Sequence, residues 1–92
     1  MEIPSCSSRQ VIRASLRLGF FMKPGGKGSH TKLQHGLTGK VIIVPETKDI
    51  GKGLRTKIVS DISAITGKSI ADIVRILGMS SIFFLVNRLF RF

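Results

Sequence analysis

The sequence predicts an α+β fold in which one helix, three antiparallel strands and a second helix follow in order, with an apolar extension at the C-terminal end. Helical periodicity occurs on both sides of a central segment that alternates or is β-branched, and Gly-rich turns separate these segments. The 92 residues leave room for one small domain. We therefore expect an α-β-β-β-α sandwich in which two helices cover one face of a small sheet.

The first helix is expected over residues 8–18, after a disordered leader at residues 1–6. Ser7 and Gln10 have the spacing of a capping box, and Gly19 is typical of the residue that ends a helix. The expected apolar arc of this helix consists of Val11, Ile12, Ala14, Leu16 and Leu18. The opposite arc carries arginines at one-turn intervals, Arg9, Arg13 and Arg17, which suit a phosphate backbone or a solvated helix face about equally well.

Three strands are expected at residues 20–22, 29–35 and 40–44, separated by a Gly- and Pro-rich loop and a hairpin turn at 36–39. Alternation along the second strand places His30 and Lys32 on one face. The same alternation places His35 on the other face, where we expect it to be structural or exposed to solvent. Phe20 and Phe21 are expected in the core, with base stacking as the alternative.

A second helix is expected over residues 53–65, with a core stripe formed by Leu54, Ile58, Ile62 and Ile65. Its N-terminal end carries three cations, Lys52, Arg55 and Lys57. Cations at this end oppose the helix dipole, so we interpret them as suited to a bound polyanion.

A short third helix is expected from Ser69 to about Leu77, so that residues 7–77 form the domain and residues 78–92 an apolar, basic tail. The apolar run at 76–86 is shorter than the roughly 20 residues that span a bilayer, and no stable membrane insertion is expected. The tail could instead complete a thin core, cover a partner interface, or lie on a membrane surface.

The charge balance points to a polyanion as the partner. The chain has 15 Lys and Arg against 5 Asp and Glu, a net charge of +10. A basic surface that only maintains solubility is the alternative. Clustered carboxylates usually hold divalent cations, so five scattered acids predict metal-independent chemistry with no cofactor. The single cysteine, Cys6, excludes an internal disulfide, and with no visible secretory signal it favours the cytoplasm.

The motif Lys27-Gly28-Ser29-His30 stands where the glycine loop becomes the second strand. Imidazole is the side chain that changes charge near neutral pH, and RNA supplies its own nucleophile in the 2′-hydroxyl. The residues indicate phosphate contacts by Lys27 and Lys32, and for an RNA partner His30 would be the candidate base. The alternatives are a histidine that is only exposed or hydrogen-bonded, and a non-catalytic RNA- or DNA-binding module that uses the same basic surface.

Five motifs in register resemble the HicA-type, or YcfA-like, mRNA interferase toxins of type II toxin-antitoxin systems. They are Ser8-Arg9-Gln10-Val11-Ile12, Leu18-Gly19-Phe20, Lys27-Gly28-Ser29-His30, Ile43-Val44-Pro45 and Ile50-Gly51-Lys52-Gly53-Leu54-Arg55. The resemblance covers residues 7–74. It implies a fold like the double-stranded-RNA-binding domain, endoribonuclease activity on mRNA, and a HicB-type antitoxin as the protein partner.

The resemblance also implies that His30 is the catalytic residue. The expected site therefore has His30 as its base and contains no metal. The residues expected to contact RNA or phosphate are Lys27, Gly28, Ser29, Lys32, Lys52, Arg55, Arg9 and Arg13.

Overall fold

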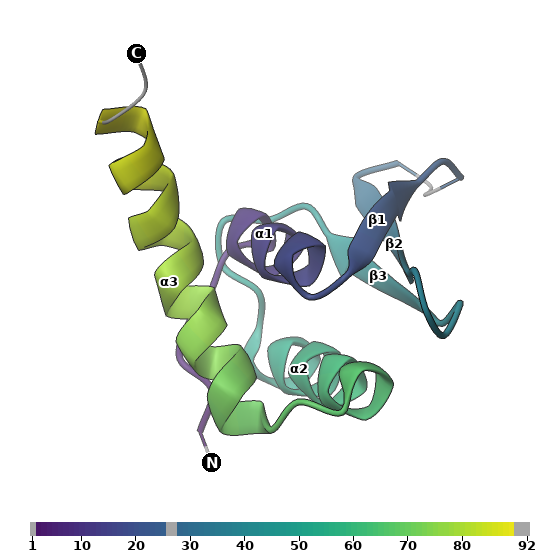
Figure 1. Cartoon of the computed structure of the whole chain (residues 1–92). Coiled ribbons are helices and arrows are strands. Elements are labelled where there is room, and N and C mark those ends of the chain that lie inside the picture. Colours follow the sequence, from purple (N-terminus) through teal and green to yellow (C-terminus); the bar gives the residue numbers. More distant parts are fainter. Residues whose placement is uncertain (1, 26–27, 90–92) are drawn as a thin grey trace.

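The computed structural model describes residues 2–25 and 28–89 (Figure 1). Its elements are α1 (Ser8–Arg17), β1 (Phe20–Lys23), β2 (His30–His35), β3 (Val41–Pro45), α2 (Lys52–Thr66) and α3 (Ile70–Leu89). This is the predicted α-β-β-β-α order with a helical C-terminal part, so the expected fold class is confirmed. The first five elements begin and end within a residue or two of the predicted positions.

The third helix differs from its prediction, because it continues to Leu89 and does not end near Leu77. A glycine, Gly78, follows the expected end. An isolated glycine costs a helix only about 1 kcal/mol relative to alanine, and the residues that follow include no proline. The helix therefore continues into the segment predicted as a separate tail.

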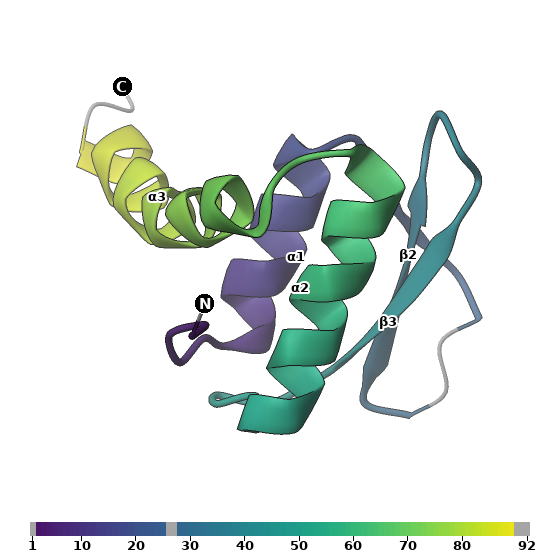
Figure 2. The ribbon, with the colours of Figure 1, turned by 90° about the horizontal axis from the view of Figure 1, so that it is seen from below.

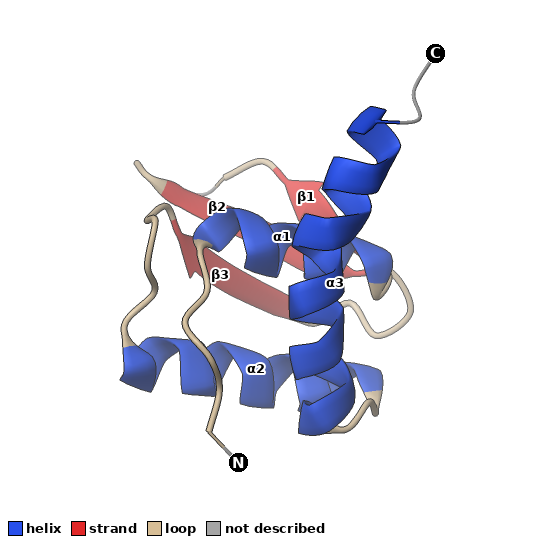
Figure 3. Ribbon diagram, turned by 90° about the vertical axis from the view of Figure 1, so that its left-hand side faces the viewer, coloured by secondary structure: helices blue, strands red, loops and turns tan. Residues whose placement is uncertain are grey.

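The structure has three layers. The strands form an antiparallel sheet in the order β1-β2-β3, and α1 and α2 lie side by side on one face of it (Figure 2). Helix α3 crosses the far side of the two helices and contacts both (Figure 3). No described element covers the other face of the sheet, which we call the outer face.

The core fills the space between the sheet and the three helices. Its most completely buried large side chains are Leu33 of β2, Ile50 before α2, Ile62 of α2 and Ile73 of α3. Each such side chain contributes about 1.5–3 kcal/mol through burial. The start of α3 therefore belongs to the same core as the sheet, and Leu77 is its last buried residue among those whose side chains are described.

Helix α1 begins at the predicted capping box, in which Ser7 Oγ accepts from the Gln10 amide at 3.2 Å and Gln10 Oε1 accepts from the Ser7 amide at 2.9 Å. Its predicted apolar arc is wrong at one position, because Leu16 is 44% exposed. Ser15 is buried in its place and donates to the Val11 carbonyl at 2.8 Å. Ser15 lies only about 40° round the helix from Val11 whereas Leu16 lies about 140° away, and the hydroxyl is satisfied by its own helix.

The segment before α1 is ordered by contacts with the core, so the predicted disordered leader is wrong for residues 2–6. Ile3 and Cys6 are both buried. The Cys6 carbonyl accepts from the Ile50 amide at 2.9 Å, and Arg55 Nε donates to the Ile3 carbonyl at 3.0 Å. Burial raises the pKa of the Cys6 thiol, an effect that the nearby Arg55 guanidinium partly opposes.

Within residues 2–25 and 28–89, no helix is both long enough and apolar enough to cross a membrane.

Candidate functional site

His30 is the first residue of β2 and is exposed. Two backbone features fix the chain where it enters this strand. Gly28 has a φ of +60°, a left-handed conformation that other residues adopt only with strain, although the space around it is open. The Ser29 carbonyl accepts from the Glu46 amide at 2.6 Å, which ties the start of β2 to the end of β3. Gly28 and Ser29 thus set the position of His30 at one corner of the sheet.

The strand register arranges the outer face in rows. His30 lies opposite Pro45 in the first row. In the second row Lys32 lies between Lys23 and Ile43, and in the third row Gln34 lies between Phe21 and Val41. The predicted sharing of one face by His30 and Lys32 is therefore confirmed. Lysines directly opposite each other repel, so the Lys23–Lys32 pair is an unfavourable arrangement for the isolated protein.

His30 also borders a hollow of about 360 Å³ between β3 and α2. The helix contributes Leu54, Lys57 and Asp61 to the lining, and β3 contributes Ile43 and Pro45. Lys57 Nζ donates to Asp61 Oδ2 at 2.8 Å. Sequence reasoning placed Lys57 among the cations of the helix start and did not include Leu54 or Asp61 in the site. The positions of Leu54, Lys57, Ile58 and Asp61 follow the pattern i, i+3, i+4 and i+7, which places them on one helix face. The pattern does not show that this face meets His30.

The second histidine has a structural role, one of the two options that the sequence left open. His35 is only 6% exposed and lies on the inner face, where its ring meets the Phe20 ring edge-on with centroids 4.9 Å apart. Its Nε2 is 3.1 Å from the Leu18 carbonyl oxygen, which can only accept, so Nε2 carries the proton. Nδ1 then accepts from the Thr38 amide at 3.3 Å. His35 thus joins the end of α1 to the β2–β3 turn.

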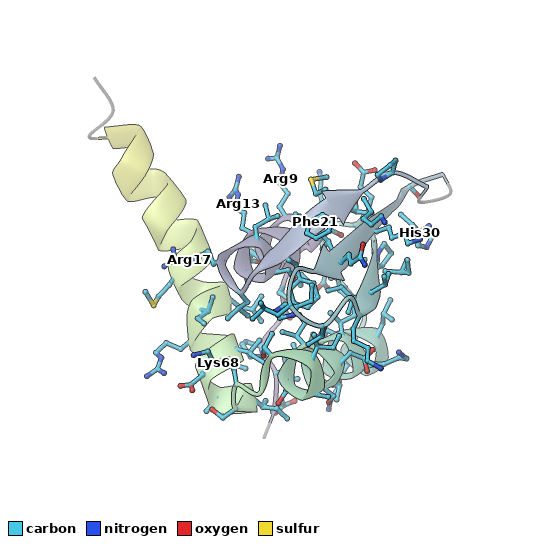
Figure 4. The ribbon with its side chains drawn as sticks, turned by 45° about the vertical axis from the view of Figure 1, so that its right-hand side comes forward. Arg9, Arg13, Arg17, Phe21, His30 and Lys68 are labelled. Carbon is cyan, nitrogen blue, oxygen red and sulfur yellow. The ribbon has the colours of Figure 1, made fainter. Side chains whose placement is uncertain are left out.

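Arg9 and Arg13 project from α1 on the side away from α2 (Figure 4). The start of this helix is held near the His30 corner, because the Ser8 hydroxyl hydrogen-bonds the Pro45 carbonyl and accepts from the Thr47 amide at 2.7 Å. Arg9 borders a second hollow there, together with Glu46 and Lys48. The first turn of α1 therefore adds a cation beside the end of β3.

The cations at the start of α2 have different surroundings from those predicted. Arg55 is half-buried, and it donates to the Ile3 carbonyl and, through Nη1, to the Ile50 carbonyl at 3.2 Å. Lys52 forms an exposed ion pair with Glu2 at 3.4 Å. Both therefore face the N-terminal segment, whereas Lys57 faces the hollow beside His30. Lys27 lies outside the described residues.

Across the described part of the chain, no three His, Cys, Asp or Glu side chains come together in a way that could hold a metal ion. Asp61, the acidic residue that lines the hollow beside His30, is paired with Lys57.

Comparison with known proteins decides the family. A family model described as the HicA toxin of bacterial toxin-antitoxin matches residues 8–64, more than half of the chain. The chain belongs to the HicA toxin family. A search of the curated proteins and a search of the solved structures returned no match.

Membership of the HicA family confirms the resemblance that the five motifs indicated, and it implies an antitoxin partner in a toxin-antitoxin system. The matched span runs from the start of α1 through most of α2, so it contains His30, the outer face and the hollow. Helix α3 lies beyond it. In this HicA-family chain the part that carries the candidate site is thus the part shared with the family.

Proposed function

We propose that this HicA-family toxin is an endoribonuclease that cleaves mRNA without a metal ion and so arrests translation, with His30 as the catalytic base. The observation that carries the proposal is the exposed imidazole of His30, which borders a hollow with Lys57 and shares the outer face with Lys32. Because its substrate is mRNA under translation, we expect the protein to act in the cytoplasm.

The reaction needs few groups, because RNA carries the nucleophile. His30 accepts the proton of the 2′-hydroxyl next to the scissile phosphate, and the 2′-oxygen forms a bond to phosphorus. The bond from phosphorus to the 5′-oxygen breaks, and this oxygen takes a proton from water. The products are a 2′,3′-cyclic phosphate and a 5′-hydroxyl. Proton transfer by a positioned side chain typically contributes about 10²–10⁴-fold to such a rate.

Cations around His30 stabilise the charge that develops on the phosphate. Lys32 approaches from the outer face and Lys57 from the hollow, where Lys57 also forms an exposed ion pair with Asp61. The Gly28 and Ser29 backbone lets the RNA chain approach closely, since a glycine presents no side chain. We also assign Lys27, Arg9 and Arg13 to contacts with flanking phosphates. Arg55 and Lys52 are weaker candidates because of their contacts with the N-terminal segment.

The antitoxin is proposed to be a HicB-type protein that covers His30. The toxin carries a net charge of +10, so an acidic or shape-complementary partner would associate quickly at low salt. Co-expression with the protein encoded by a neighbouring open reading frame should restore growth and block RNA cleavage. Harmless expression of the toxin alone would contradict this assignment.

Cleavage of a single-stranded RNA by the purified protein in the presence of EDTA tests the proposal. We expect His30→Ala to bind the RNA as the wild type does but to cut it about 10²–10⁴-fold more slowly. A substrate with a 2′-deoxyribose at the cleaved position should bind and resist cutting. If the wild type binds RNA and never cuts it, the chain is instead a non-catalytic nucleic-acid-binding module. A need for added metal would overturn the metal-independent mechanism.

A further inference from the structure

The two adjacent phenylalanines of β1 have opposite environments. Phe20 is 4% exposed and packs against His35, whereas Phe21 is 46% exposed on the outer face. The prediction that both belong to the core is right for Phe20 and wrong for Phe21. Neighbours on a strand point to opposite faces, and only the inner face is covered by described helices. Phe21 therefore presents its ring to whatever binds the outer face.

Phe21 stands in line with the candidate catalytic residue. The row of His30 comes first, the row of Lys23 and Lys32 second, and the row of Phe21 and Gln34 third. Successive rows are about 7 Å apart, because a strand rises roughly 3.4 Å per residue. A chain lying along the strands would therefore meet the imidazole, then two ammonium groups, then an aromatic ring.

The facing lysines suggest what lies between the ring and the imidazole. Like charges directly opposite each other destabilise a sheet, and a bound anion would remove the repulsion between Lys23 and Lys32. The protein as a whole has a net charge of +10. Charge complementarity therefore favours a polyanion as the occupant of this face.

We propose that the outer face is a track for single-stranded RNA, on which Phe21 stacks a base while Lys23 and Lys32 hold a backbone phosphate between that base and His30. This inference depends on the proposed function for the identity of its substrate. Unpaired bases expose the flat surfaces that an aromatic ring can stack on, whereas a duplex hides them. Phe21 is thus a binding residue that positions the RNA, and the site discriminates in favour of single strands.

Binding should be measured with a short fluorescent single-stranded RNA and its matched duplex, in a His30→Ala background that leaves the RNA intact. We expect Phe21→Ala to weaken single-strand binding about 5- to 150-fold, and Phe21→Trp to retain it. Duplex binding should change little. Met22→Ala is the matched control, because Met22 is 58% exposed on the same strand but belongs to the other face.

The salt dependence of binding separates stacking from charge. For a single strand the slope of log affinity against log salt concentration changes by about 0.7 for each phosphate contact. Lys23→Gln and Lys32→Gln should each reduce the slope by about that amount. Phe21→Ala should lower the affinity and leave the slope unchanged, because stacking releases no counterions.

Three results would overturn the proposal. The first is an unchanged RNA affinity in Phe21→Ala, and the second is an equal loss of RNA affinity in Met22→Ala. The third is a Phe21→Ala variant that loses antitoxin binding while its RNA binding stays intact. The last would identify the face as a protein-docking surface. Each of these is independent of catalysis. If the wild type cuts RNA in EDTA but Phe21→Ala binds normally, the stacking track fails and the nuclease stands. If nothing cuts RNA and Phe21→Ala still weakens binding as expected, the nuclease fails and the track stands.

Discussion

The two faces of the sheet each carry one histidine, and the contrast between them separates a structural role from the proposed catalytic role. His35 on the inner face is buried, and both ring nitrogens are used in hydrogen bonds to Leu18 and Thr38. His30 on the outer face is exposed beside a hollow and two lysines that repel each other. The contacts of His35 on the inner face stabilise the fold. The facing lysines on the outer face destabilise the isolated protein, so stability does not explain them.

The largest expected effect is on the outer face. His30→Gln should lower the rate of RNA cleavage about 10²–10⁴-fold, because the variant cannot accept the 2′-hydroxyl proton. Its melting temperature should stay close to that of the wild type, since the side chain is exposed. Single-turnover cleavage and thermal melting measured on the same preparation would test both statements. Full activity in His30→Gln would remove His30 from the mechanism.

The matching change on the inner face should reverse this pattern. His35→Ala leaves the Leu18 carbonyl and the Thr38 amide without their partner and opens a cavity beside Phe20, at a cost of about 2–4 kcal/mol. Urea unfolding should show this loss. Any folded fraction at low temperature should still cleave RNA. A stable variant without activity would mean that His35 takes part in catalysis.

Gly19, in the turn between α1 and β1, leaves room for the ring of His35 on the inner face. It has a φ of +94°, and a Cβ built there would lie 3.3 Å from His35 Nε2. We therefore expect Gly19→Ala to destabilise the protein by about 1–2 kcal/mol in urea unfolding. Gly53→Ala is the control, because it places a methyl group in open space within α2 and should stabilise by up to about 1 kcal/mol. Equal responses of the two variants would contradict a specific role for Gly19.

A smaller effect of opposite sign is expected at the facing lysines. Lys32→Glu replaces a repulsion across the Lys23–Lys32 pair with an attraction and should stabilise the fold by about 0.2–1 kcal/mol at low salt. The same variant should bind RNA less well. Lys68→Glu carries the same charge change on the α2–α3 turn and should affect RNA binding much less. If Lys32→Glu binds RNA normally, the second row contributes nothing to the substrate site.

The smallest effect should come from removing the end of α3. Truncation after Leu77 keeps Ile73 and Leu77, the buried residues of α3 among those whose side chains are described, and we expect no measurable change in melting temperature or RNA cleavage. This would support the proposed division of the chain into residues 7–77 and 78–92. Binding to anionic lipid vesicles that is present in the full chain and lost on truncation would support a membrane-surface role for the tail. Unfolding of the truncated chain would contradict the division.

Local sequence signals predicted much of this structure, because each depends on residues a few positions apart. The capping box of Ser7 and Gln10, the left-handed Gly19 and the turn before β3 are set by hydrogen bonds and φ angles within one segment. Alternation also placed His30 with Lys32 on one face and His35 on the other. Signals that needed knowledge of a distant partner failed, as the exposed Phe21 and the ordered Ile3 show.

The sequence by itself determined the order of helices and strands, the excess of positive charge and the family to which the chain belongs. Only the tertiary structure decided which of two neighbouring phenylalanines is buried, which cation of α2 faces His30, and that Lys23 stands opposite Lys32. The physical reason is that periodicity assigns a residue to a face, whereas its environment depends on whether another element covers that face. In this protein the described helices cover the inner face, and the candidate site lies on the outer face and in the hollow between β3 and α2.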